Sequence, residues 1–134
     1  MRTLARETLF KTLFSSQFSS VVDDNLKNAL YVSAKLNDAD KAYCERVLKI
    51  IEERKEEFKN LINEHSYAFP ESRIYPADKS ILLIALAEIL YMDDVPDKVA
   101  VNEAGNIASK YSSEKSASFI TGILSTVIGG KENV

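Results

Sequence analysis

Residues 76–91 read PADKSILLIALAEILY, and this stretch decides the fold. Pro76 suits the first turn of a helix, where its missing N–H leaves no hydrogen bond unmade. After it, apolar side chains fall on every side of a helical projection, with Glu88 among them. A helix that is apolar all round belongs at the centre of a fold. The stretch therefore predicts a central helix in which Glu88 needs a partner.

Outward from this helix, the chain consists of apolar segments at helical spacing, separated by short breaks. It has four glycines and three prolines, and no segment shows sustained strand-like alternation. Asp23 and Asp24 suit the N-terminus of one helix, and Asn37 and Asp38 end that helix and cap the next. Gly129 is expected to stop the last helix. The pattern predicts one all-α domain, 1–134, of six to seven helices. Its helices are expected at about 4–18, 25–36, 39–63, 76–91, 97–111 and 114–128.

Composition limits the possible functions. The 46% hydrophobic content suffices for one core, and the net charge of −3 provides no overall basic field for nucleic acid. RNA binding would therefore need a local basic patch. The single cysteine, Cys44, excludes a disulfide framework and a cysteine-based zinc site within one chain. No signal peptide is visible, and the longest apolar run, 81–87, is too short to span a bilayer. We expect a cytoplasmic protein without membrane contact.

The residues give little support for catalysis. His65 is the only histidine and lies at the edge of a connector, and the glycines do not have the spacing of a phosphate-binding loop. Asp93, Asp94 and Asp97 cluster, but they lack the calcium-loop pattern and its terminal glutamate. We expect no enzymatic activity, no catalytic residue, no metal and no cofactor.

Two groups of residues favour binding instead. Near the N-terminus, Arg2 and Arg6 add positive charge, and Arg6 falls on the apolar side of its helix. It is therefore expected to pair at the rim of the core or to meet an anion there. In the last helix, Phe119 lies at the edge of the apolar stripe, with Lys115 on the same flank. An edge aromatic can stack on an unpaired base and a lysine can meet a phosphate, but Phe119 can equally be a core residue.

Four segments together extend over nearly the whole chain: RETLFKTLF (6–14), RIYPADKSILLIALAEI (73–89), VPDKVAVNEA (95–104) and SEKSASFITGIL (113–124). In this order they resemble the NusB family of transcription antitermination factors. The strongest is VPDKVAVNEA, similar to the family's VP.KVAINEA.

The resemblance implies an all-helical fold of two small bundles and a role in ribosomal RNA transcription. It implies binding to boxA-type single-stranded RNA together with the ribosomal protein NusE, within the RNA polymerase antitermination complex. It also allows a homodimer, since some members self-associate. The residues that it places on the RNA side are Arg2, Arg6, Lys115 and Phe119. Those that it places on the partner side are Phe14, Phe18, Asp78 and Glu88.

The chain departs from the family pattern at several polar positions. Two other functions therefore stay open: a protein-only interaction module, and the RNA-binding domain of a ribosomal RNA cytosine methyltransferase. Salt-sensitive RNA binding would favour the antitermination factor over the protein-only module, and a neighbouring catalytic domain would favour the methyltransferase. The departures are Leu83 for Arg, Ala87 for Tyr, Ser112 for Gly, Ser118 for a basic residue, Thr121 for Asn and Ser125 for Asp.

Overall fold

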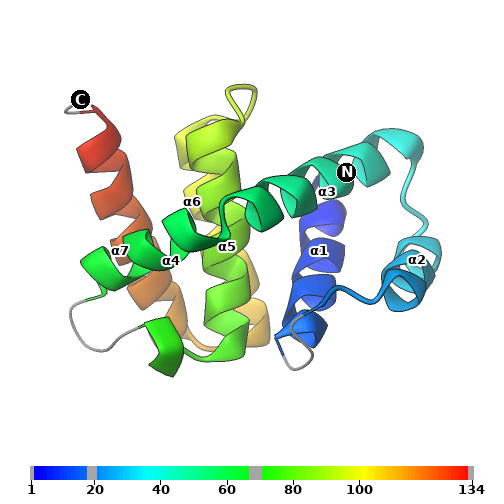
Figure 1. The fold of residues 1–134 in the computed structure, drawn as a ribbon, viewed down its shortest axis with the longest axis horizontal. Helices are drawn as coiled ribbons and strands as arrows, with labels where there is room; N and C mark the ends of the chain where they lie inside the picture. Colours follow the sequence, from blue (N-terminus) through cyan, green and yellow to red (C-terminus); the bar gives the residue numbers. More distant parts are fainter. Residues whose placement is uncertain (1, 18–20, 67–70, 133–134) are drawn as a thin grey trace.

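The computed structural model describes residues 2–17, 21–66 and 71–132, and Figure 1 shows their arrangement. Within these residues the regular structure is helical throughout, which confirms the predicted all-α class. None of these helices combines the length and apolar character needed to cross a membrane. The elements are α1 (Arg2–Ser16), α2 (Asp24–Ser33), α3 (Asp38–Glu53), α4 (Lys55–His65), a 3-10 turn (Glu71–Arg73), α5 (Pro76–Tyr91), α6 (Asp97–Tyr111) and α7 (Glu114–Glu132).

The predicted helix starts are confirmed by their caps. The Asp23 carboxylate accepts hydrogen bonds from the backbone N–H groups of Asn25 and Leu26. The Asn37 side chain accepts one from the N–H of Asp40 at 2.8 Å. Such caps satisfy amides that have no partner within the helix. Pro76 is the first residue of α5, as expected.

The predicted single helix over 39–63 is wrong. It breaks at Arg54, whose φ of −113° and ψ of 21° leave the helical region, and α4 starts at the next residue. Tertiary contacts account for the break, because α3 packs on α1 and α5 whereas α4 packs on α7. Tyr91 holds the bend: its hydroxyl donates to the Glu57 carboxylate at 2.6 Å, and the Arg54 guanidinium lies 4.7 Å from its ring centre.

The prediction that Gly129 stops the last helix is also wrong, because α7 continues to Glu132. The ammonium of Lys131 donates to the carbonyl oxygen of Ile89 at 2.7 Å and to the Asp97 carboxylate at 3.1 Å. A helical glycine costs only about 1 kcal/mol relative to alanine. Gly129 and Gly130 together cost about 2 kcal/mol on this scale, and the contacts of Lys131 offset part of that cost.

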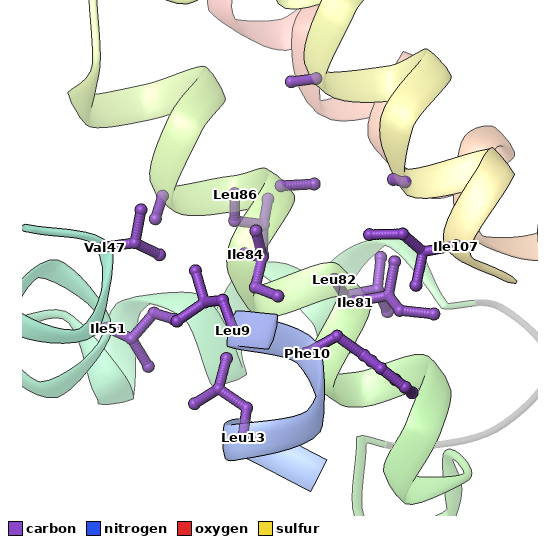
Figure 2. Close-up of a cluster of buried hydrophobic side chains, with 14 of the residues drawn as sticks. Leu9, Phe10, Leu13, Val47, Ile51, Ile81, Leu82, Ile84, Leu86 and Ile107 are labelled. Carbon is purple, nitrogen blue, oxygen red and sulfur yellow. The ribbon is translucent and has the colours of Figure 1, made fainter. Parts of the chain in front are cut away.

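The helices form two small bundles that share α5. In Figure 1, α1, α2 and α3 lie on one side and α4, α6 and α7 on the other, and α5 contacts α1, α3, α6 and α7. Figure 2 shows where the two bundles meet: Leu9 of α1, Val47 of α3 and Leu86 of α5 lie in one cluster with Ile107 of α6. Leu82 and Leu86 are fully buried. The predicted central position of residues 76–91 is confirmed.

Candidate nucleic-acid interface

A buried ionic network joins α1, α3 and α5. The Arg6 guanidinium reaches Glu88 Oε1 from Nε at 2.8 Å and from Nη2 at 2.7 Å. The Tyr43 hydroxyl donates to the same oxygen at 2.6 Å. Glu103 of α6 lies further off, with its Oε2 3.9 Å from Arg6 Nη1. Glu88 therefore has the partner that its apolar surroundings demanded.

The positive charge of Arg6 and the negative charge of Glu88 stabilise each other although both side chains are buried. Burial alone would lower the pKa of Arg6, but the hydrogen bond and the charge of Glu88 outweigh it and the net shift is upward. Burial, followed by the negative charge of Glu88, raises the pKa of Tyr43, so this hydroxyl stays protonated as a donor. Arg6 is 4% exposed and Glu88 is 1% exposed. The structure thus places one RNA-side candidate and one partner-side candidate together in the interior.

Arg2, by contrast, remains partly exposed at the start of α1. Its guanidinium carbon lies 4.3 Å from the centre of the Tyr43 ring, within cation–π range. Tyr43 thus donates a hydrogen bond to Glu88 through its hydroxyl and contacts Arg2 with the face of its ring. Of the two N-terminal arginines, Arg2 is the one whose side chain reaches the surface.

Lys115 and Phe119 lie in the first two turns of α7. Lys115 is exposed, and Phe119 is partly buried against the core. One turn beyond them, Gly122 faces open space: apart from its chain neighbours and the nearby backbone of α7, no atom lies within 4 Å of where a Cβ would stand. Arg2 lies on a different helix, α1, which packs on α6 as α7 does. Thr3, next to Arg2, donates a 3.3 Å hydrogen bond to Glu103 of α6. The candidates are spread over α1 and α7.

An aromatic series extends from α1 to the end of α6. Phe14 is 37% exposed and stacks on Phe10 at a ring distance of 5.9 Å, and Phe10 lies 5.1 Å from Tyr111. The ammonium groups of Lys11 and Lys110 lie 5.9 and 5.3 Å from the Tyr111 ring. Phe14 therefore belongs to a partly exposed aromatic surface flanked by cations. Phe18, the other aromatic partner-side candidate, lies outside the described residues.

Asp78 is buried at the N-terminus of α5, with 3% of its surface exposed. Its two carboxylate oxygens accept hydrogen bonds from the hydroxyls of Ser112 and Ser116, at 3.0 and 2.9 Å. The carboxylate therefore fixes the turn between α6 and α7, immediately beside Lys115. Ser112 is a departure from the family's glycine, so this hydrogen bond comes from a residue that the family pattern lacks.

Sequence reasoning missed Tyr43 and Ser116 as members of these networks. Helical spacing over 39–63 puts Tyr43 on the buried side, but no periodicity tells that its hydroxyl meets Glu88. A signal was available for Ser116, because it follows Ser113 at capping distance. The Ser113 hydroxyl accepts from its N–H at 3.0 Å.

Comparison with known proteins identifies the family. The chain is 36% identical to the transcription antitermination protein NusB of Clostridium botulinum (strain Hall), over 95% of this chain and 96% of that protein. The structure of T. maritima NusB superposes on this chain with a TM-score of 0.86 at 26% sequence identity. The match covers 95% of this chain and 89% of the T. maritima chain. A crystal structure of antitermination factors NusB and NusE in complex with dsRNA also shares the fold, with a TM-score of 0.86 at 19% identity and 96% of each chain covered. Residues 2–129 match the model of the NusB family, and this chain belongs to that family.

Proposed function

We propose that this chain is a non-enzymatic transcription antitermination factor that binds boxA-type single-stranded RNA together with a ribosomal protein of the NusE type. The observation that carries the proposal is the family match over residues 2–129, with curated relatives named for antitermination. A chain of the same fold comes from the crystal structure of NusB and NusE in complex with dsRNA, which motivates RNA as the class of nucleic acid and a NusE-type protein as the partner. The protein would act as one domain in the cytoplasm, where bacterial transcription takes place.

The proposed RNA surface uses Arg2, Lys115 and Phe119. Lys115 is exposed for a phosphate, and Phe119 offers a ring at the edge of the core for a base. Arg2 is held on Tyr43 and adds a second cation. Arg6 acts indirectly in this proposal, because its guanidinium is hydrogen-bonded to Glu88 in the interior.

The proposed partner surface centres on Phe14. Phe14 is exposed and connects through Phe10 to Tyr111, where the lysines lie. Such an aromatic surface suits a protein interface, where aromatic anchors contribute much of the binding energy. Asp78 contributes by fixing the turn before α7, since its carboxylate is buried. Phe18 remains a proposed contact. Because few phosphates would be contacted, we expect this chain alone to bind RNA weakly. With the partner bound, we expect tighter RNA binding.

Titration of a boxA-like single strand at several salt concentrations tests the RNA surface. Phe119→Leu keeps most of the apolar volume but removes the ring, so affinity should fall roughly five- to a hundredfold, since stacking is worth about 1–3 kcal/mol per base. Lys115→Ala should weaken binding less and reduce the salt slope by about 0.7. Lys55→Gln, which removes an exposed cation on α4, is the matched control and should change neither.

The same experiment separates the alternatives. If Phe119→Leu leaves affinity unchanged while melting stays normal, Phe119 is a core residue and the RNA surface lies elsewhere. If the protein binds the NusE-type partner but no RNA at any salt concentration, the chain is a protein-only module. Equal RNA affinity with and without the partner would contradict a cooperative complex. Self-association that competes with RNA would indicate a homodimer.

A further inference from the structure

A groove of about 290 Å³ lies between the first turn of α1, the first half of α3 and the turn after α5. Its base is closed by Tyr43 and Met92, which are both buried. The wall on α3 includes Ala39 and Ala42, which are exposed but too small to fill the space. The groove is therefore open to solvent above an aromatic and apolar floor.

Charged side chains from three elements line this groove. Arg2 extends from α1 over the Tyr43 ring, and Arg46 of α3 pairs with Asp94 of the turn at 3.1 Å between Nη1 and Oδ1. The Arg46 and Asp94 side chains are 48% and 58% exposed, so a competing anion can reach the arginine. A backbone hydrogen bond, then the hydrogen bond and charge of Arg46, lower the pKa of Asp94 and keep it anionic.

We propose that this groove is a second RNA-contacting site, in which Arg46 binds a phosphate of the strand that contacts Arg2 and Asp94 competes for the same guanidinium. The inference rests on the proposed function and deepens it. A guanidinium presents several donors in one plane and binds phosphate in the way it binds a carboxylate. A phosphate can therefore take the position that the Asp94 carboxylate holds in the free protein.

The charge distribution of the chain supports RNA as the occupant. Of the two N-terminal arginines, Arg6 is buried on Glu88, which leaves Arg2 to face an anion. Arg46 adds a second guanidinium across the groove and makes it a two-arginine site. The Arg2 guanidinium lies on the Tyr43 ring, so the groove is expected to take the sugar–phosphate backbone while bases stack elsewhere.

Three single variants test the proposal on the full chain: one should weaken RNA binding, one should tighten it, and the third is a control. Arg46→Gln should weaken binding of a boxA-like strand with unpaired flanking nucleotides about two- to fivefold, as for an exposed ion pair, and should lower the salt slope by about 0.7. Asp94→Asn keeps the turn's hydrogen bonding but removes the competing charge, so it should tighten binding by a similar factor. Lys55→Gln removes an exposed, ion-paired cation of α4 and should have no effect.

The double variant and the melting curves complete the test. If Asp94 acts by occupying Arg46, the gain from Asp94→Asn should shrink in the Arg46→Gln background. The proposal is overturned if Arg46→Gln behaves like Lys55→Gln, or if Asp94→Asn leaves RNA affinity unchanged or lower while melting stays normal. In that case a continued effect of Lys115→Ala would show that the proposed function stands without the groove. Absence of RNA binding in the unaltered protein would refute both.

Discussion

Removing the Glu88 carboxylate should expose how much the fold depends on its buried ion pair. In Glu88→Ala, Arg6 keeps its charge in a site that is 4% exposed, and the Tyr43 hydroxyl loses its acceptor. Breaking a buried pair by removing one partner costs about 3–5 kcal/mol. Glu103, at 3.9 Å from Arg6, offsets only part of this loss because it is beyond hydrogen-bond distance. We expect about 3–5 kcal/mol of destabilisation.

Urea unfolding followed by circular dichroism measures this loss by linear extrapolation. The double variant Arg6→Met, Glu88→Met is the decisive comparison, because it removes both charges and replaces them with apolar volume. Such replacements are often neutral or stabilising, so the double variant should be more stable than Glu88→Ala alone. If Glu88→Ala costs less than about 1 kcal/mol, or the double variant is no more stable, the stranded charge is not the cause.

Three further variants or treatments probe the rest of the core. Leu86→Ala should cost about 2–5 kcal/mol in urea unfolding, because it opens a cavity where Leu86 is fully buried; an effect below about 0.5 kcal/mol would show that α5 is not central. Cys44 is fully buried, and burial raises the pKa of its thiol to about 12, so an alkylating reagent at neutral pH should label it only after unfolding; rapid labelling of the folded protein would contradict this. Asp78→Ala should lower stability by about 1–3 kcal/mol because the hydroxyls of Ser112 and Ser116 lose their acceptor, and an unchanged melting temperature would argue against it.

Local chemistry made most of the helices predictable. The α5 pattern revealed both its ends and its position, because an all-apolar helix has only one stable place in a small domain. Asp23 and Asn37 revealed two helix starts, since a cap is a contact within a few residues. The break at Arg54 had no such signal: no glycine or proline marks it, and the bend depends on Tyr91, which is far along the chain.

The candidate site was harder to predict from the sequence, because its contacts also join residues that are far apart in the chain. The position of Arg6 on an apolar face indicated that it would pair, but its partner Glu88 lies 82 residues away and was assigned to a different surface. A burial pattern shows that a side chain faces inward, whereas the identity of its contact depends on how helices pack. The groove at Arg46 was invisible in the sequence, because its walls come from three separate elements.

The shared position of α5 bears on how the chain acquires its structure during synthesis. The first bundle packs on α5 through α1 and α3, so until α5 has left the ribosome the residues before it lack their main apolar surface. Arg6 also lacks its carboxylate until then. Domains fold as units once their contacts are available, and these contacts span a long stretch of sequence. We therefore expect the N-terminal half to stay unfolded on the ribosome and both bundles to form in one cooperative step after α5 appears.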